Sequence, residues 1–304
     1  MEFYTCDVFT EQRFGGNPLA VIPDARGLDA AQMQQIALEF NYSESTFVFP
    51  PEQNQTRRVR IFTPTVELPF AGHPNIGTAF VLASIGALGA SPSRVVFEEG
   101  AGLVPVEIAW SGGRPTWCEL QAPAALSVER TASPEQAAAA LSIEPDEVSS
   151  VVHPPQVASV GLEFLFVELV NRSALERLRV DVAGFEALVA AGLPDGVYAY
   201  VRGAEATGLT VAAGDFDIHS RMFVPLDGVQ EDPATGSAGC ALVALLAHLD
   251  GGASEEFRLR IAQGVEMGRP SMLDARAIRR GGEVVSAHIG GSCVMVARGE
   301  LQLD

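Results

Sequence analysis

The sequence predicts an α+β fold of two similar halves, each a curled, mostly antiparallel, barrel-like sheet around a central apolar helix. Three observations predict it: short segments that alternate apolar and polar residues, two segments that are apolar nearly all round, and a motif series that occurs twice. Alternation with a period of two is typical of half-buried strands, and a helix without a polar face has to be enclosed by other structure. At 304 residues the chain is long enough for two domains.

The alternating segments predict strands along the whole chain, at Phe3–Phe9, Arg57–Phe62, Leu103–Trp110, Trp117–Gln121, Glu163–Val170, Val197–Val201, Phe257–Ala262 and Val284–Ile289. Asp29 can cap a helix whose apolar stripe has i, i+3, i+4, i+7 spacing, at Met33, Ile36, Ala37 and Phe40. Ser133-Pro134 begins another helix, with proline in its first position. The two apolar helices are predicted at Ile76–Leu88 and Ala238–Leu249.

A strand–loop–helix series occurs in both halves. Arg60–Pro64 and Arg221–Pro225 share the pattern R-x-F-x-P, and the loops that follow share E-x-P-x-x-G, at Glu67–Gly72 and Glu231–Gly236. Each copy then enters one of the two apolar helices, so the matched order favours duplication over chance. We expect one domain at 1–115, completed by the C-terminal strands 284–304, a second at 116–283, and an active site in the cleft between them.

The charge of the chain restricts its partners. Twenty basic against 38 acidic side chains give a net charge of −18, which repels nucleic acid and anionic lipid. The apolar runs fall short of the roughly 20 residues of a membrane span, and the first residues do not read as a signal peptide. The four cysteines lie far apart without C-x-x-C spacing, so neither a zinc site nor a disulfide framework is indicated. We expect a cytoplasmic protein without nucleic-acid or membrane partners.

Each E-x-P-x-x-G loop ends at the start of a helix. The first turn of a helix has unpaired N–H groups and the positive end of the helix dipole, so it attracts carboxylates. Gly72 and Gly236 would allow a ligand to approach the backbone closely. The alternative is that the glycines and prolines only shape tight turns. The occurrence of two such loops favours a site for a small carboxylated substrate.

Several motif blocks in matched order resemble the phenazine-biosynthesis PhzF-like family, whose fold is that of diaminopimelate epimerase. The blocks are Asp7–Thr10, Gly16–Val21, Asn41–Phe47, Phe62–Pro64, Glu67–Pro74, Glu231–Ala238 and Gly264–Ser271. Ala71 and Thr235 stand where the racemases of that fold have catalytic cysteines, so two-base racemase chemistry is not expected. Ser45 and Asn75 stand where the family usually has threonine.

The resemblance implies a cofactor-independent isomerase with Glu44 as its acid/base residue. His73 and Asp232 would complete the catalytic set, and the substrate contacts would come from Gly72, Gly236 and Ser237. The family's best-understood reaction moves a proton within trans-2,3-dihydro-3-hydroxyanthranilate, in phenazine biosynthesis. It requires no metal, flavin, nicotinamide or pyridoxal, so we expect no cofactor and no metal site. Family members are often homodimers, and a homodimer is expected here.

The residue types suit this chemistry, because a partly buried carboxylate whose pKa is raised can take a proton from carbon and return it elsewhere. Without the resemblance, however, a single Glu44 is more often a surface charge, His73 a capping or core histidine, and Asp232 a turn residue. The alternating Asp215, Asp217 and His219 are interpreted as a solvated strand face, not as metal ligands.

Two other functions stay open. A small-ligand-binding protein that retains the fold would need only the helix-start glycines, and a lyase or hydrolase would use the same acid/base set. The joint presence of Glu44, His73 and Asp232 favours an enzyme. The fold does not dictate the substrate.

Overall fold

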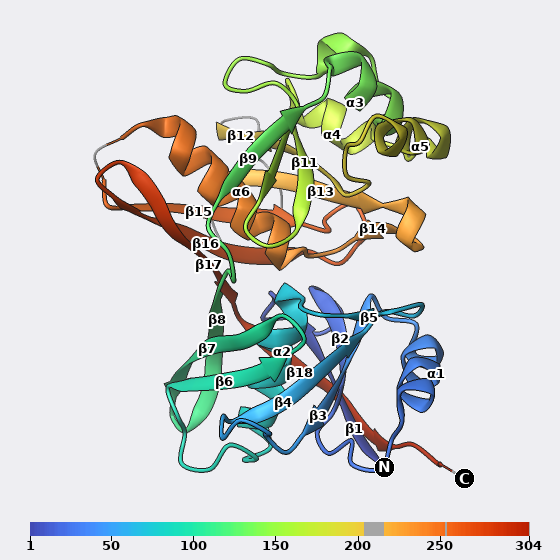
Figure 1. The fold of residues 1–304 in the computed structure, drawn as a ribbon, viewed down its shortest axis with the longest axis vertical. Helices are drawn as coiled ribbons and strands as arrows, with labels where there is room; N and C mark the ends of the chain where they lie inside the picture. The colour runs from blue at the N-terminus through green and yellow to red at the C-terminus, as the bar shows by residue number, and fades with distance from the viewer. Residues whose placement is uncertain (204–215, 253, 304) are drawn as a thin grey trace. The chain divides into compact units, whose positions relative to one another are not determined.

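Two units make up the chain, and the computed structural model describes their residues 1–203, 216–252 and 254–303 (Figure 1). Unit 1 comprises Met1–Gln121 and Gly290–Asp304, and unit 2 comprises Ala122–Ile289. Both consist mainly of strands with few helices, which confirms the predicted α+β class.

Unit 1 is a mixed sheet in the order β8–β7–β6–β4–β3–β2–β1–β18, with the short β5 paired to β4. Six of these eight pairings are antiparallel, and β2–β3 and β4–β6 are parallel. The sheet is not closed into a barrel. Its strands are β1 (Glu2–Val8), β2 (Asn17–Ile22), β3 (Glu44–Phe49), β4 (Arg57–Phe62), β5 (Glu67–Leu68), β6 (Arg94–Glu99), β7 (Gly102–Ser111), β8 (Arg114–Gln121) and β18 (Cys293–Glu300).

Unit 2 has the pairing order β9–β10–β11–β12–β13–β15–β16, with β14 paired to β13. The pairs β11–β12 and β13–β15 are parallel, and the others are antiparallel. The strands are β9 (Ser127–Thr131), β10 (Gln156–Ser159), β11 (Glu163–Glu168), β12 (Val197–Arg202), β13 (Ile218–Val224), β14 (Val229–Asp232), β15 (Glu256–Gln263), β16 (Ser271–Arg280) and β17 (Glu283–Gly291).

The two units therefore repeat one topology. Counted from β18 in unit 1 and from β9 in unit 2, the sense of pairing runs antiparallel, antiparallel, parallel, antiparallel, parallel, antiparallel in both. β4 corresponds to β13, β5 to β14 and β6 to β15. The predicted duplication is confirmed at the level of strand order.

Each repeat contains one enclosed helix that follows its E-x-P-x-x-G loop. In unit 1, α2 (Gly72–Ser84) is buried at every position from Gly72 to Ala83. In unit 2, α6 (Gly236–Asp250) is buried from Ala238 to Ala247. Figure 1 shows both helices running among the strands of their own unit. Both helices begin at the motif glycine, so α2 starts four residues before the predicted Ile76. The end of α2 is set by Gly86, whose φ of +74° suits the turn that follows the helix.

The remaining helices lie against the sheets. α1 (Ala30–Phe40) has the predicted cap, since the Asp29 side chain accepts a hydrogen bond from the backbone N–H of Gln32. It packs Met33, Ile36 and Ala37 against sheet residues such as Phe47. In unit 2, α3 (Pro134–Leu141), α4 (Arg172–Arg177) and α5 (Val182–Ala190) share an apolar core with β10–β13 (Figure 1).

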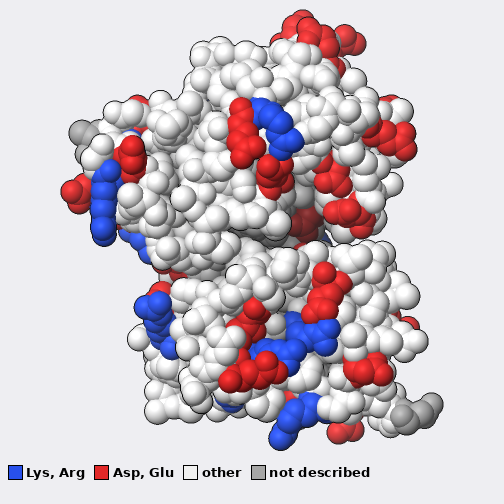
Figure 2. All heavy atoms as spheres, viewed as in Figure 1, with Lys and Arg blue, Asp and Glu red and all other residues white. Residues whose placement is uncertain are grey.

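Among the described residues, no helix is both long enough and apolar enough to span a membrane. On the face drawn in Figure 2, acidic side chains are scattered over both units.

Candidate active site

Glu44 and His73 lie together in unit 1. Glu44 is the first residue of β3, and His73 is the second residue of α2. The His73 Nε2 atom lies 3.5 Å from Glu44 Oε2, and the side chains are 4% and 17% exposed. The structure thus brings together two of the three predicted catalytic residues, a carboxylate and an imidazole, at the start of the enclosed helix.

The orientation of His73 is set by a hydrogen-bond chain. Ser43 Oγ donates to Asn17 Oδ1 at 2.9 Å, and Asn17 Nδ2 lies 3.3 Å from His73 Nδ1. With the Asn17 oxygen occupied by the serine hydroxyl, its amide donates to Nδ1, and the neutral imidazole then carries its proton on Nε2. Burial lowers the pKa of His73 to about 3, so this ring is neutral at pH 7.

The contact of His73 with Glu44 is therefore a polar contact of a neutral imidazole, not an ion pair. Nε2 is buried and makes no hydrogen bond within the described part of the chain. A buried N–H without an acceptor costs free energy, so the group is ready to donate to a bound molecule. Its neighbour Glu44 supplies the carboxylate that could move a proton.

Asp232 ends β14 in unit 2 and is 9% exposed. Its Oδ2 accepts a hydrogen bond of 2.6 Å from Thr235 Oγ1. Gln263 fixes the loop between them: Nε2 donates to Asp232 O at 2.8 Å, and Oε1 accepts from Thr235 N at 3.1 Å. Asp232 is thus held in place in the loop between β14 and α6.

A second layer supports Gln263. Tyr198 Oη donates to Gln263 Oε1 at 3.2 Å and lies 2.8 Å from Ser220 Oγ. Burial keeps the pKa of Tyr198 above its ordinary value, so the phenol stays a donor at neutral pH. Gly264 follows Gln263 with φ +72°, and a Cβ there would lie 2.5 Å from Pro233 O. The G-V-E-M-G-R-P-S motif therefore requires a glycine at its first position.

The predicted substrate-binding residues lie at the two helix starts. Gly72 and Gly236 are the first residues of α2 and α6, and both are buried. Neither N-cap residue, Ala71 or Thr235, makes a side-chain cap to the helix. Ser237 follows Gly236 in the first turn of α6 and is partly exposed. Neither N-cap side chain therefore occupies the first-turn N–H groups of its helix, which suits a helix start that binds a carboxylate.

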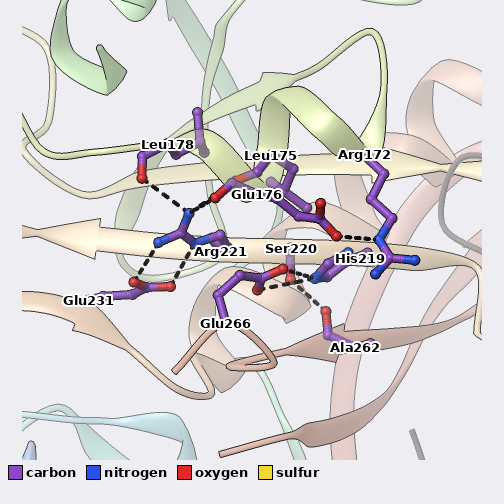
Figure 3. A network of polar contacts seen from close by, with 10 residues as sticks. All are labelled: Arg172, Leu175, Glu176, Leu178, His219, Ser220, Arg221, Glu231, Ala262 and Glu266. Atoms are coloured by element: carbon purple, nitrogen blue, oxygen red, sulfur yellow. Dashed lines mark hydrogen bonds and ion pairs between the residues drawn. The ribbon is translucent and has the colours of Figure 1, made fainter. Parts of the chain in front are cut away.

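The repeated R-x-F-x-P and E-x-P motifs have a common structural role. Arg60 pairs with Glu67 at 2.6 Å in unit 1, and Arg221 pairs with Glu231 at 2.8 Å in unit 2, each through two hydrogen bonds. Figure 3 shows the second pair, in which Arg221 also reaches backbone oxygens of Leu175, Glu176 and Leu178. Each pair ties a strand to the loop that starts the enclosed helix.

His219 is buried, so the predicted solvated face is wrong at this position. It contacts Glu266 at 3.0 Å (Figure 3). Asp217 accepts a hydrogen bond from the backbone N–H of Arg260, and Asp215 lies outside the described residues. Within the described ranges, no group of three or more His, Cys, Asp or Glu side chains could hold a metal ion.

Residues 6–299 match the model of the phenazine biosynthesis-like protein family, PhzC-PhzF. This chain belongs to that family. Two relatives align over nearly their whole lengths. An uncharacterized isomerase of Mesorhizobium japonicum is 39% identical and covers 97% of this chain and 96% of its own. The trans-2,3-dihydro-3-hydroxyanthranilate isomerase of Pseudomonas aeruginosa is 36% identical, with 99% of both chains covered.

The PhzC-PhzF fold is also found by structure comparison. A Bacillus anthracis protein described as a phenazine biosynthesis protein of the PhzF family superposes with a TM-score of 0.88. It covers 100% of this chain and 99% of its own, at 24% identity. Family membership and the named isomerases together assign this chain to the isomerases.

Sequence reasoning did not single out Asn17, Ser43 or Gln263. Asn17 and Ser43 stand inside two of the motif blocks, Gly16–Val21 and Asn41–Phe47, and this was the available signal. Gln263 directly precedes the Gly264–Ser271 block. Each of the three holds another residue in place by a hydrogen bond, and the amino-acid sequence alone does not reveal such a role.

Proposed function

We propose that this isomerase moves a proton within a small carboxylated substrate without a cofactor, as a trans-2,3-dihydro-3-hydroxyanthranilate isomerase does. The observation that carries the proposal is the pair at the start of α2, where Glu44 Oε2 lies 3.5 Å from Nε2 of a buried, neutral His73. The relative of that name from Pseudomonas aeruginosa supports the substrate type.

Glu44 takes the proton from carbon and returns it at another position of the substrate. A carboxylate is suited to both steps, because one oxygen accepts the proton and the same group then donates it. His73 keeps its Nε2 proton and donates a hydrogen bond to substrate or to Glu44. The charge that develops on the substrate is then stabilised without a change of protonation at His73.

The substrate carboxylate binds at a helix start, at Gly72 or at Gly236 with Ser237. Asp232, held by Thr235 and Gln263, contributes the third polar group. We propose that both helix starts act on one substrate. A double substitution tests this: if Asp232→Asn and Glu44→Gln act on one transition state, their effects on turnover are not additive.

The chemistry proposed needs no cofactor. All 20 basic residues counted in the sequence are arginines, so the chain offers no lysine to hold pyridoxal as a Schiff base. A cytoplasmic location, a homodimer and the absence of nucleic-acid or membrane partners stay predictions. The net charge of −18 supports the last of these.

The deciding experiment is Glu44→Gln, assayed with trans-2,3-dihydro-3-hydroxyanthranilate in ²H₂O. Glutamine keeps the shape of the side chain and removes the exchangeable carboxylate. We expect turnover and deuterium incorporation to fall by about 10²–10⁴-fold, the usual contribution of a general acid/base, while substrate binding persists. Glu107→Gln, a surface carboxylate of unit 1, is the matched control and keeps full activity.

Normal turnover by Glu44→Gln on a confirmed substrate would refute this mechanism. The alternative of a non-catalytic ligand-binding protein predicts another result: the wild-type protein binds carboxylated rings by calorimetry but exchanges no substrate hydrogen with ²H₂O.

A further inference from the structure

Glu99, the last residue of β6, has a buried carboxyl group with no ion-pair partner among the described residues. Neither of its oxygens is accessible to solvent, and neither makes a hydrogen bond among the described residues. It lines a cavity of about 450 Å³ together with two arginines. Both arginines are already engaged, Arg58 with Glu52 and Arg60 with Glu67. Burial raises the pKa of Glu99 to about 8, and a weaker interaction with the Asn75 amide acts in the opposite direction.

Asn75 lies in the first turn of α2, two residues after His73. Its Nδ2 donates to Ala71 O at 2.8 Å, which leaves Oδ1 as the free end of the amide. That Oδ1 atom is also buried and accepts no hydrogen bond among the described residues. The two interacting side chains thus present three buried acceptor oxygens, and the one N–H that the Asn75 amide has left cannot donate to its own Oδ1. One proton on the Glu99 carboxyl would supply the missing donor, because a neutral carboxylic acid has an O–H group.

The repeat supplies an independent comparison for this position. The motif match of Arg60 with Arg221 aligns Arg58 with His219. Arg58 pairs with Glu98 across β4–β6, and His219 pairs with Ala262 across β13–β15. The next residues, Glu99 and Gln263, are therefore equivalent.

The glycines that follow support this equivalence. A Cβ on Gly100 would lie 3.2 Å from Pro69 Cα, and a Cβ on Gly264 would lie 3.0 Å from Pro233 Cα. Gln263 is a neutral side chain that donates to the E-x-P-x-x-G loop of unit 2. At the same place under the loop of unit 1, a neutral Glu99 matches it in charge and, like it, has both a hydrogen-bond donor and an acceptor.

We propose that Glu99 is a positioning residue of the candidate active site: as a neutral carboxylic acid, it donates a hydrogen bond to Asn75 Oδ1 and fixes the first turn of α2. That turn carries His73, so Glu99 acts through the imidazole and not on the substrate. The catalytic consequence rests on the proposed function, whereas the protonation of Glu99 does not.

The charged groups around Glu99 leave its proton in place. Glu98 on β6 is turned to the backbone N–H groups of Glu52, Gln53 and Gln55, which lower its pKa. Arg58 and Arg60 on β4 are paired, the latter with Glu67 on β5. His73 on α2 is neutral. None of these groups supplies a free positive charge that would favour the ionised form of Glu99.

The first test measures the free energy of unfolding of wild type, Glu99→Gln and Glu107→Gln between pH 4 and pH 9. The folded pKa of Glu99, about 8, lies above the ordinary value of 4.5, so the folded state holds an extra proton between these limits. Stability from this group is lost as the pH rises through that window. Relative to wild type, the folding constant of Glu99→Gln should rise by up to about tenfold per pH unit there.

The surface variant Glu107→Gln should run parallel to wild type. Parallel curves for wild type and Glu99→Gln would overturn the proposal. If Glu99→Gln does not fold, the ¹³C shift of the Glu99 carboxyl in wild type decides instead: a carboxylic acid at pH 6 supports the proposal, and a carboxylate refutes it.

The second test follows turnover against pH. Wild-type kcat should fall severalfold between pH 7 and pH 9, as the donor to Asn75 is lost, while kcat of Glu99→Gln stays level. A residue that only fills space would not change this profile. The same alkaline fall in both proteins would refute the positioning role. Inactivity of wild type on all carboxylated ring substrates would refute the proposed function and leave the stability test to decide on Glu99.

Discussion

The two Arg–Glu pairs of the repeat offer a comparison of one interaction at two depths. Arg221 and Glu231 are 9% and 17% exposed, and Arg221 also donates to the backbone oxygens of Leu175 and Leu178. Arg60 and Glu67 are 21% and 41% exposed. Removal of one partner from a buried pair costs about 3–5 kcal/mol, because the other charge stays buried, whereas an exposed pair contributes about 0–1 kcal/mol.

We therefore expect Arg221→Met to destabilise unit 2 by about 3–5 kcal/mol, and Arg60→Met to destabilise unit 1 by about 1 kcal/mol. Methionine keeps the apolar contact with Phe223 or Phe62, over which each guanidinium lies. The double variant Arg221→Met/Glu231→Gln also removes the carboxylate that has lost its partner, so it should recover part of the lost stability.

Amide hydrogen exchange is the suitable assay, because peptides from each unit report its opening separately. The reasoning fails if Arg60→Met costs as much as Arg221→Met, or if Arg221→Met leaves the protection of unit 2 unchanged. Failure of the double variant to recover stability would show that the lost contacts to the backbone oxygens outweigh the stranded charge.

Two further predictions concern pH and backbone strain. The pKa of His73 in the folded protein, about 3, lies below its ordinary value of 6.5, so the stability that this group contributes is lost as the pH falls from about 6.5 towards 3. The ¹⁵N spectra should therefore show a neutral ring at pH 5. A ring that titrates near pH 6.5 would contradict its burial. Gly264→Ala should lower the free energy of unfolding more than the control Gly268→Ala does. Both glycines have φ near +70°, but only a Cβ at Gly264 would meet backbone, at 2.5 Å. Equal free energies of unfolding for the two variants would contradict this clash.

Much of the fold could be predicted from local pattern. The alternating segments, the capped helix after Asp29 and the two apolar helices all appear in the structure. The strands β2, β3 and β10 were not predicted, because they are buried on both faces and do not alternate. Nor was α5, in which Gly184 lowers helix propensity; a Cβ there would lie 2.7 Å from the backbone of Ala140, so close packing on α3 requires the glycine.

The site was less accessible to sequence reasoning. Glu44 and His73 were singled out by family resemblance, since neither residue is distinctive by its neighbours alone. Their supporting residues come together only through the parallel pairing of β2 with β3, which sets Leu19 opposite Glu44 and so brings Asn17 near Ser43. Which strands pair is decided by burial over the whole sheet, and not by the residues of either strand.

The repeated topology also has an evolutionary consequence. Two units of the same strand order carry His73 against Ser237 and Glu99 against Gln263 at equivalent places, so each half shows a second side chain that this arrangement of strands can accommodate. If the two units descend from a symmetric ancestor, exchanging the side chains of two equivalent positions should disturb the fold less than other substitutions there. Specialisation of the two halves could then proceed one residue at a time, without any change in the order of the strands.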